Sequence, residues 1–368
     1  MRRYLYEAKD WPNFRWDLKQ VSILLALVRY KQGRLLGRME MLGFELRTEV
    51  VLKNLTMDVL KSSEIEGELL DREQVRSSVA RRLGMDVVGL VLADRNVEGV
   101  VEMMLDATQN YGQPLTEERL FGWHAALFPT GYSGRQKIAL GAWRGPEAGP
   151  MQVVSGAMGK EMVHFEAPPA EKLEAEMQAY LSWHNDAIGL DPVLKAAIGH
   201  FWFVTVHPFD DGNGRIARAL ADMLLARADG TAKRFYSMSA QIRLERKAYY
   251  EVLERTQNGV DLDITAWLVW FLECLGRALD VAEENTHGVL VRTRYWDKHG
   301  HQTINARQRL VLNRLLDGFE GKLTTSKYAK LAKCSQDTAL RDVQDLVSKG
   351  MLVKLGGGGR SVGYGVAR

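Results

Sequence analysis

The sequence predicts a mainly α-helical protein, with one β-hairpin near the middle of the chain and a short pair of strands near its end. Residues 18–36 and 39–60 contain no proline and carry apolar side chains at helical spacing, which predicts two long amphipathic helices. Residues 141–164 interrupt this pattern, because they are rich in glycine and hold the β-prone run 152–154, which is a hairpin signal. The rest of the segment 96–285 returns to helical spacing.

The composition is that of an ordinary soluble globular protein, with 46% hydrophobic and 26% charged residues. The 368 residues are enough for two or three domains, each with its own core. No apolar run reaches transmembrane length and the first residues hold no apolar export signal, so we expect no membrane partner and a cytoplasmic location. The two cysteines, Cys274 and Cys334, fall in different segments, which indicates reduced thiols rather than a disulfide or a zinc site.

Residues 1–95 are expected to form a helical N-terminal domain. Its first residues are rich in aromatic side chains, which we interpret as core packing of this small domain rather than as a ligand cage. These aromatic residues are Tyr4, Tyr6, Trp11, Phe14 and Trp16.

Residues 96–285 are expected to form a central, largely helical domain. Thr116 stands where it would cap the first of its clear helices, and His124 on that helix has an expected structural role. The expected helices cover residues 115–128, 171–183, 196–206, 216–227 and 246–256.

Residues 301–368 are expected to form a separate C-terminal domain with a basic surface. They hold 12 Lys and Arg against 5 Asp and Glu, a net charge of +7, whereas the whole chain carries +3. Three helices followed by two strands around a glycine-rich tip are typical of a winged helix-turn-helix unit. Ser335 would cap its recognition helix, from which Gln336, Thr338 and Arg341 would face outward. Such a domain binds DNA, or serves as a dimerisation or protein-docking module. The expected elements are helices 306–316, 325–331 and 336–348 and strands 352–355 and 363–366.

A polar stretch, residues 207–218, lies between two apolar helices, 196–206 and 216–227. Gly212 and Gly214 allow the backbone to turn without a Cβ, so that successive N–H groups at the start of the second helix point at an anion. The stretch therefore predicts a phosphate site.

The side chains of this stretch supply the chemistry that a phosphate site needs. Arg215 and Arg218 are three residues apart at the start of a helix, close enough to hold neighbouring phosphate groups. Asp211 offers a hard oxygen ligand of the kind that Mg²⁺ takes alongside substrate phosphates. His207 is the one group here that accepts a proton near neutral pH. An ordinary glycine-rich helix junction would use some of these residues, but it would not need all of them in this order.

The string HPFDDGNGRIAR at 207–218 resembles the HPFx(D/E)GNGRxxR signature of Fic-domain proteins at every signature position. Members of this family are mostly adenylyltransferases, which move AMP from ATP to a hydroxyl side chain of a target protein. The resemblance implies an all-helical Fic core with a small β-hairpin flap, in which His207 is the catalytic base and Asp211 the Mg²⁺ ligand. The backbone of 212–214 and the Asn213 side chain would contact the α-phosphate. The nucleotide-binding residues implied by the signature are Asp211, Gly212, Asn213, Gly214, Arg215 and Arg218.

A second string, SSEIEG at 62–67, resembles the inhibitory motif (S/T)xxxE(G/N) of the family, with Ser62, Glu66 and Gly67 in the matching positions. In the family this glutamate pairs with the second signature arginine and occupies the space of the ATP γ-phosphate. The pair here would be Glu66 with Arg218, and a buried guanidinium at a phosphate site favours a carboxylate partner. The WPxFxWD string near the N-terminus also resembles an extension of one subgroup of bacterial Fic proteins.

The predicted hairpin falls where the family carries its flap, which holds the modifiable segment of the target through main-chain hydrogen bonds. Tyr249 and Tyr250 lie where family members close over the nucleotide base, and Gln257 aligns with a polar residue at the ribose or base edge. Of the two tyrosines, Tyr250 is the one that we expect to touch ATP. The expected flap positions are Val153, Val154, Ser155 and Gly156.

The sequence thus predicts an autoinhibited, Mg²⁺-dependent protein adenylyltransferase that uses ATP on a Ser, Thr or Tyr hydroxyl, with removal of AMP as a reverse activity. The alternatives are a Fic-type transferase of another phosphate-containing group, and a DNA-binding regulator whose Fic core senses nucleotide. Gly214 stands against the kinase-like branch of the fold, which has a Lys in its place. The expected partners are a target protein docked on the flap, the chain itself as a substrate, a second copy in a homodimer, and DNA at the C-terminal domain.

Overall fold

The computed structural model describes residues 4–85, 90–155, 162–186, 189–316, 321–355 and 362–367. The chain divides into two compact units, Met1–Ala282 and Glu283–Arg368, which we call the N-terminal and the C-terminal unit. The predicted mainly helical fold is confirmed, since strands occur among the described residues only as short antiparallel pairs. Residues 1–95, expected as a domain of their own, are part of the N-terminal unit, where their helices pack on those of the core.

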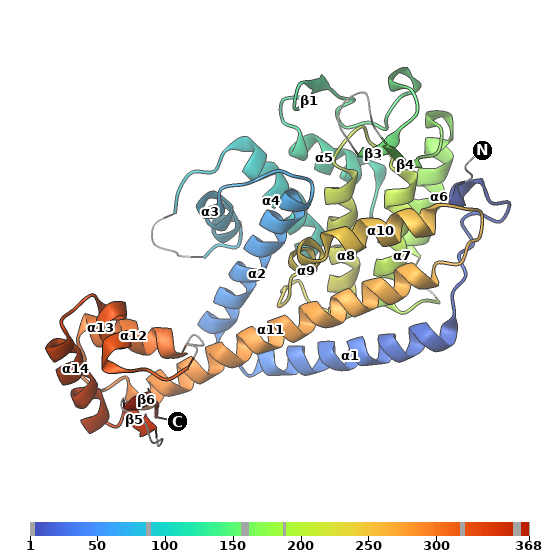
Figure 1. Ribbon diagram of the computed structural model, residues 1–368. Helices are drawn as coiled ribbons and strands as arrows, with labels where there is room; N and C mark the ends of the chain where they lie inside the picture. The colour runs from blue at the N-terminus through green and yellow to red at the C-terminus, as the bar shows by residue number, and fades with distance from the viewer. Residues whose placement is uncertain are drawn as a thin grey trace. The chain divides into compact units, whose positions relative to one another are not determined.

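The N-terminal unit is a succession of helices interrupted by two short strand pairs (Figure 1). Its last helix, α11, begins in this unit and ends in the C-terminal unit. The 3₁₀ helices are η1 (Leu5–Glu7), η2 (Pro146–Ala148) and η3 (Ala170–Lys172). The strands are β1 (Tyr132–Ser133), β2 (Gln136–Lys137), β3 (Gln152–Ser155) and β4 (Met162–Glu166). The α-helices are α1 (Leu18–Glu40), α2 (Phe44–Ile65), α3 (Arg72–Arg82), α4 (Arg95–Gln109), α5 (Glu117–Leu127), α6 (Leu173–Asn185), α7 (Pro192–Val206), α8 (Asn213–Asp229), α9 (Met238–Leu244), α10 (Arg246–Gln257) and α11 (Thr265–His299).

The centre of the N-terminal unit is the pair of helices α7 and α8, which lie side by side (Figure 1). Helix α7 starts at Pro192, whose fixed φ suits the first helical position, and Asp191 caps it by accepting from the Val193 N–H. All of its residues over 196–206 are buried, so this sequence is apolar around the whole helix rather than on one face. Apolar burial, at about 25 cal/mol per Å², fixes the two helices and with them the ends of the loop that connects them.

The aromatic residues near the N-terminus pack against the core of the N-terminal unit. Trp11 and Phe14 make edge-on contacts with Trp202 of α7, with ring centroids 6.1 and 5.9 Å apart. The Trp11 indole also donates to the carboxylate of Glu176 on α6 at 2.9 Å. These side chains therefore cover α6 and α7 instead of forming the core of a small domain, because an apolar pattern indicates burial but not the surface that is covered.

The predicted hairpin is the antiparallel pair β3 and β4, with a register shift between Val153 and Val154. At its base the Ala167 N–H donates to the Met151 carbonyl at 2.9 Å, which ties the two feet of the hairpin together. Among the described residues β3 pairs with no strand other than β4. Its outer edge can therefore accept a further strand.

The C-terminal unit has the predicted order of three helices and two strands. Apolar side chains, among them Val311, Leu346 and Tyr364, form its core. Ser335 caps α14 as predicted, with its hydroxyl accepting from the Thr338 N–H at 3.2 Å. The elements are α12 (Ala306–Leu316), α13 (Thr325–Ala332), α14 (Gln336–Ser348), β5 (Leu352–Leu355) and β6 (Gly363–Val366).

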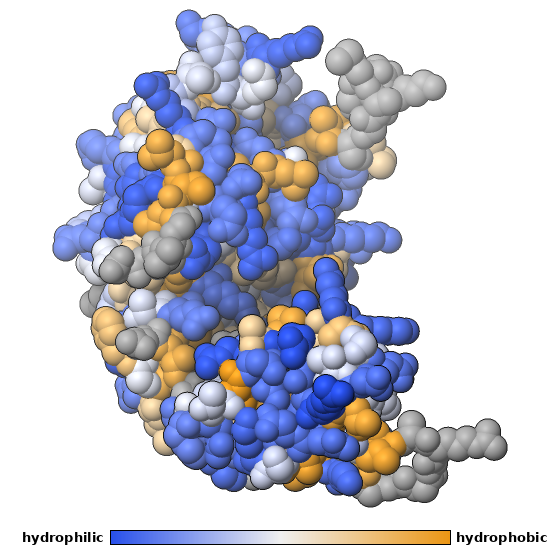
Figure 2. All heavy atoms as spheres, turned by 90° about the vertical axis from the view of Figure 1, so that its left-hand side faces the viewer, coloured by the Kyte–Doolittle hydropathy of each residue, from blue (hydrophilic) through white to orange (hydrophobic). Residues whose placement is uncertain are grey.

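The surface carries both polar and apolar side chains. Hydrophilic atoms predominate on the face drawn in Figure 2, and hydrophobic atoms form smaller patches between them. Single exposed apolar side chains are normal on protein surfaces. None of the described helices is long and apolar enough to cross a membrane.

Candidate functional site

The predicted phosphate loop runs from the end of α7 to the start of α8. His207 ends α7 in a left-handed conformation, with φ 51° and ψ 58°, which costs a residue with a Cβ roughly 1–2 kcal/mol. Gly212 has φ 82°, and a Cβ there would lie 3.0 Å from the ring of Phe128, so both the backbone angle and the neighbouring ring require glycine. Helix α8 starts at Asn213 without a side-chain cap. Its first N–H groups have no intrahelical partners, and such groups bind anions.

Side chains of the loop hold it closed. The Asn213 side chain accepts from the Phe209 N–H at 3.0 Å and donates to the Phe209 carbonyl at 2.7 Å. Asp210 accepts from the Ala139 N–H at 2.8 Å, which ties the loop to the segment after β2. The Asn213 side chain, which we expected at the α-phosphate, thus bonds to the loop itself. Its backbone N–H, at the start of α8, has no intrahelical partner and can still bind an anion.

His124 of α5 supports the loop from one side. Its ring stacks on that of Phe209, with centroids 4.3 Å apart, and its Nδ1 accepts from the Gly141 N–H at 3.2 Å. Burial lowers the pKa of His124 to about 4, so the ring is neutral at pH 7. These contacts are those of a packing group, in agreement with the expected structural role.

The two nitrogens of the His207 imidazole have different roles. Nδ1 lies 3.1 Å from the carbonyl oxygen of Val204, and because a carbonyl only accepts, this nitrogen carries the proton. Nε2 is then the unprotonated atom of the neutral ring. Burial lowers the pKa of His207 below its ordinary 6.5, and the positive charge of Arg144 acts in the same direction. At pH 7 the ring is therefore neutral and able to accept a proton at Nε2.

Asp211 is the expected metal ligand. Its Oδ1 accepts from the following Gly212 N–H at 2.6 Å and its Oδ2 accepts from the Ser133 hydroxyl, so each oxygen keeps a lone pair. Within the described parts of the chain, no three His, Cys, Asp or Glu residues gather in a way that could hold a metal ion. A single carboxylate beside a helix N-terminus fits Mg²⁺ that arrives with a nucleotide, because this ion binds through one or two carboxylates together with substrate phosphates and water.

The predicted inhibitory motif forms the end of α2. The Gly67 N–H donates to the Glu64 carbonyl at 3.2 Å and the Glu68 N–H donates to the Ser63 carbonyl at 3.0 Å, the two bonds of a Schellman motif. Gly67 has the positive φ, 88°, that this motif needs. Glu66 and Glu68 flank this glycine and so project from the same turn. Sequence reasoning singled out Glu66 and Gly67 but missed Glu68, whose signal is its place directly after the helix-ending glycine.

Each of the two signature arginines pairs with one of these carboxylates. Arg218 Nη2 lies 2.7 Å from Glu66 Oε1, so the expected pair is present. Arg218 also donates to the hydroxyl and the carbonyl of Ser62, at 2.9 and 2.8 Å. Arg215 Nη1 lies 2.5 Å from Glu68 Oε2. The arginine side chains are only 1% and 3% exposed, whereas those of the glutamates are 31% and 50% exposed.

A buried guanidinium needs a counter-charge, and Glu66 supplies it to Arg218. Burial works against the charge of Arg218, but the Glu66 carboxylate, with the phenol groups of Tyr249 and Tyr250, outweighs burial and raises the pKa of Arg218. Carboxylate and phosphate oxygens both suit the guanidinium fork. The two glutamates therefore bond to the arginines in the manner that phosphate groups would.

Gly214 lets the turn at the end of α2 reach the loop. A Cβ at Gly214 would lie 2.1 Å from Glu66 Oε1, so any other residue here would displace the carboxylate. From the opposite side, Arg246 of α10 donates to the Ile65 carbonyl at 2.8 Å and the Tyr250 hydroxyl donates to Glu66 Oε2 at 3.4 Å. The end of α2 is thus held between α8 and α10.

The three expected contacts on α10 separate into one at the site and two in the core. Tyr250 is partly exposed and touches Glu66, so it stands beside the arginines. Tyr249 is 2% exposed and its hydroxyl bonds with His200 Nε2 at 2.9 Å. Gln257 is 4% exposed and donates to the Thr205 hydroxyl at 3.1 Å. Tyr249 therefore lies in the core while Tyr250, the tyrosine expected to touch ATP, lies at the site. Gln257, expected at the ribose or base edge, has its amide bonded inside the core instead.

The hairpin carries three of the four expected flap positions. Val153, Val154 and Ser155 belong to β3, whereas Gly156 lies outside the described residues. Val154 is 47% exposed, and Val153 packs with Phe165 against the N-terminal segment. Val154 and the free backbone edge of β3 are the parts that a target chain could contact.

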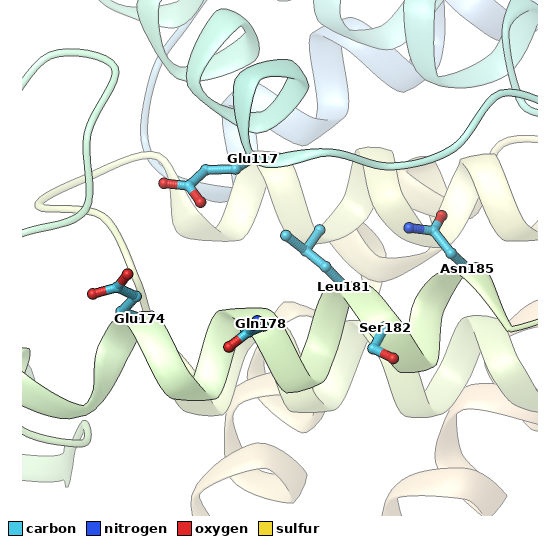
Figure 3. A pocket seen from close by; sticks show the side chains of 6 residues that line it. All are labelled: Glu117, Glu174, Gln178, Leu181, Ser182 and Asn185. Atoms are coloured by element: carbon cyan, nitrogen blue, oxygen red, sulfur yellow. The ribbon is translucent and has the colours of Figure 1, made fainter.

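A separate polar pocket of about 380 Å³ lies between the start of α5 and helix α6 (Figure 3). Glu117 comes from α5, and the other side chains come from α6. None of the signature residues contributes to it, so we do not assign the site to this pocket. Its lining residues are Glu117, Glu174, Gln178, Leu181, Ser182 and Asn185.

The fold and the site together define a helical domain in which a helix N-terminus, two buried arginines and a neutral histidine lie on one loop and the helix that follows it. Residues 114–225, which contain this loop, match the model of the Fic/DOC family. Residues 4–85 match that of a domain of unknown function, DUF4172. Residues 114–225 are thus similar to the Fic/DOC family, and they contain the whole of the predicted phosphate loop.

Several relatives carry the name "Protein adenylyltransferase Fic". The one from Nematostella vectensis is 36% identical over 116 residues, which are 31% of this chain and 25% of the relative. The one from Drosophila willistoni is 26% identical over 228 residues, which are 59% of this chain and 39% of the relative. The chain thus matches only 25% to 39% of the length of these curated relatives.

Two solved structures resemble the fold. A Fic family protein from Desulfovibrio desulfuricans G20 has a TM-score of 0.55 at 20% identity and covers 96% of this chain and 97% of its own. A Fic domain containing signalling protein from Bacteroides thetaiotaomicron has a TM-score of 0.52 at 22% identity, with 73% and 98% covered. At these identities the likeness concerns the fold alone, and it agrees with the helical Fic core.

Proposed function

We propose that the N-terminal unit is a protein adenylyltransferase that transfers AMP from ATP to a hydroxyl side chain of a target protein. The observation that carries the proposal is the arrangement of the loop, in which His207 with a free Nε2 precedes an uncapped helix N-terminus flanked by Arg215 and Arg218. The name shared by the curated relatives supports the same reaction.

In the proposed reaction His207 acts as general base. Its Nε2 accepts the proton of the target hydroxyl while the oxygen forms a bond to the α-phosphorus. The bond from this phosphorus to the oxygen that bridges to the β-phosphate breaks, and pyrophosphate leaves with the electron pair. Because the pKa of His207 is lowered, the ring is neutral at pH 7, with Nε2 unprotonated, before the proton transfer begins.

The remaining residues of the site position the phosphates. The backbone N–H groups over 213–215 would hold oxygens of the α-phosphate, and Arg215 and Arg218 those of the β- and γ-phosphates. Asp211 would hold Mg²⁺, which when bound neutralises charge on the phosphates. Most of the catalysis in this scheme is positioning.

The resting site is proposed to be autoinhibited by two carboxylates. Glu66 and Glu68 pair with Arg218 and Arg215, so neither arginine is available to a phosphate until its carboxylate withdraws. In each pair the carboxylate occupies the position beside the arginine that a phosphate would take. Both glutamates come from one turn. Inhibition therefore acts on the two phosphate-binding cations together.

Radiolabelled ATP tests the reaction itself. A Glu66→Gly variant incubated with α-³²P-ATP and Mg²⁺ should label itself or a protein of a lysate, whereas γ-³²P-ATP should leave no label. Label from the γ position would instead identify a kinase-like transfer. No label from either, with ATP bound, would refute nucleotide transfer and favour transfer of another phosphate-containing group or nucleotide sensing. A Glu66→Gly/His207→Ala variant is the control for labelling that does not use the site.

A second candidate function is DNA binding by the C-terminal unit. Asp342 and Asp345 are paired within the unit, with Arg307 at 3.1 Å and with Lys349 at 2.6 Å. Arg341, on the proposed recognition helix α14, is exposed. This distribution leaves a basic surface of the kind that binds phosphate backbones. Anisotropy of labelled duplex DNA over a salt series tests the proposal, and an affinity that does not change with salt would contradict it.

A further inference from the structure

Arg144, in the segment before β3, is a buried cation joined to the end of α7. It is 4% exposed. Its Nε donates to the His207 carbonyl at 2.8 Å, and its backbone N–H donates to the Pro208 carbonyl at 2.9 Å. Its Nη2 donates to the Pro168 carbonyl at 2.6 Å and to the Val206 carbonyl at 3.5 Å. One residue thus bonds to three consecutive carbonyls around His207.

The acceptors of these bonds are neutral backbone carbonyls rather than a carboxylate. Burial lowers the pKa of Arg144, so the protein keeps this cation at an energetic cost. Part of that cost is offset by the position, because the carbonyls at the C-terminus of a helix carry the negative end of its dipole. A buried arginine that closes the end of α7 in this way determines the path of the chain beyond Val206.

That path is the strained one that His207 follows. A residue with a Cβ keeps a left-handed backbone only where its surroundings hold it there. Arg144 restrains the backbone on both sides of His207, because it bonds to the carbonyls of Val206, His207 and Pro208. The left-handed turn also brings Nδ1 of His207 back to the Val204 carbonyl, the contact that leaves Nε2 unprotonated.

We propose that Arg144 is a positioning residue for the adenylyl transfer, which holds His207 in its left-handed conformation and so presents Nε2 as the base. The inference rests on the proposed function for its activity readout. Arg144 also bonds to Pro168, which follows β4, so the base of the hairpin and the catalytic loop are joined through one guanidinium. This connection would keep a fixed distance between His207 and a target segment that pairs with β3, and so between the base and the hydroxyl that it deprotonates.

The matched control is Arg227, near the other end of α8. Its guanidinium also donates to backbone carbonyls, those of Tyr111, Gln113 and His184, and burial lowers its pKa as well. Replacing Arg227 therefore removes a partly buried guanidinium with the same kind of acceptors but without contact to the loop. Any general cost of losing such a group appears in both variants.

The kinetic experiment compares Arg144→Gln, Arg144→Lys and Arg227→Gln in the activated Glu66→Gly background. We expect Arg144→Gln to lower kcat on the order of 10²-fold, as misplacement of a reacting group does, with the KM for ATP unchanged because Arg144 does not touch the phosphate-binding groups. Lysine keeps the charge but offers one point donor instead of a fork, so Arg144→Lys should recover only part of kcat. Arg227→Gln should keep kcat once activity is normalised to the ATP-binding fraction.

A spectroscopic readout does not depend on activity. Long-range ¹H–¹⁵N spectra of the histidine rings, with His207 assigned from a His207→Asn variant, report which ring nitrogen carries the proton. We expect protonated Nδ1 and unprotonated Nε2 in the unchanged chain and in Arg227→Gln, and a mixture of the two tautomers in Arg144→Gln. An unchanged tautomer in Arg144→Gln, or a kcat loss equal to that of Arg227→Gln, overturns the proposal. If the Glu66→Gly parent transfers no AMP, the proposed function fails, while the ring spectra still decide the role of Arg144.

Discussion

Release of the two signature arginines is the perturbation that tests the site most directly. Glu66 holds Arg218 with a carboxylate contact of 2.7 Å, and the arginine is almost fully buried. A phosphate that is to bind Arg218 must first displace this charge-assisted hydrogen bond, which contributes about 1.5–3 kcal/mol. At about 1.4 kcal/mol per tenfold, Glu66→Gly should raise the rate of AMP transfer about 10- to 100-fold.

The second carboxylate contributes less because it is more exposed. The Glu68 side chain is 50% exposed, so its pair with Arg215 resembles a surface ion pair of roughly 0.2–1 kcal/mol. Glu68→Gln should therefore add at most about fivefold to the activity of Glu66→Gly. On its own Glu68→Gln should change little, since Glu66 still holds Arg218. We expect the Glu66→Gly/Glu68→Gln variant to be fastest, Glu66→Gly to be slower, and the unchanged chain to be slowest.

The assay is incorporation of label from α-³²P-ATP into the protein itself, with ATP affinity measured in parallel by calorimetry. Glu64→Gln is the matched control, because Glu64 lies on the same turn but pairs with Arg243 at 3.0 Å and with Lys61 rather than with a signature arginine. This control should keep the low rate of the unchanged chain. A folded, ATP-binding Glu66→Gly variant without any gain would refute the inhibitory role of the turn. A gain in Glu64→Gln equal to that in Glu66→Gly would assign the effect to loosening of α2 instead.

Three further predictions concern the base, the metal ligand and the C-terminal unit. His207→Ala should lower transfer by about 10²- to 10⁴-fold while calorimetry still detects ATP binding, and retained transfer would sink the proposed mechanism. In the active protein the rate should hold through pH 7 and fall only below pH 6.5, because the pKa of His207 is lowered from that value and the base is lost when the ring is protonated. Asp211→Ala should weaken nucleotide binding only when Mg²⁺ is present, and an unchanged Mg²⁺ titration would place the ligand elsewhere. Removal of residues 301–368 should leave self-modification intact and abolish binding of duplex DNA, and a folded but inactive truncation would show that these residues complete the active site.

Most of the elements could be predicted because their signals are local. Helix α14 and strands β5 and β6 begin and end at the predicted residues, since a Ser335 cap and a glycine-rich tip mark these ends in the sequence itself. Helix α2, predicted over 39–60, covers Phe44–Ile65 instead. Its C-terminal bound is set by the Schellman turn at Gly67, and a helical pattern without proline does not reveal such a turn until its hydrogen bonds are known.

The contacts that the sequence did not reveal join distant parts of the chain. Glu68 is 147 residues from Arg215, and Arg144 is 63 residues from His207. A sequence signature identifies the residues expected at the ligand. It does not identify a residue such as Arg144, which bonds to backbone carbonyls, or Glu68, which lies outside the motif. The Asn213 side chain illustrates the converse, because a residue of the signature is used by the loop rather than left for the ligand.

In the proposed function, the turn at the end of α2 and the nucleotide are coupled through charge. Glu66 and Glu68 stand at the C-terminus of α2, where the helix dipole disfavours negative side chains. The turn is therefore stabilised by Arg215 and Arg218, and under the proposed function it would lose this support when phosphates bind the arginines. Linkage makes this effect reciprocal. If binding of ATP lowers the equilibrium constant for closing the turn by some factor, then closing the turn lowers the affinity for ATP by the same factor. Under the proposed function, any change that stabilises the end of α2 against its release would thus lower the activity of the site without altering the loop 207–214.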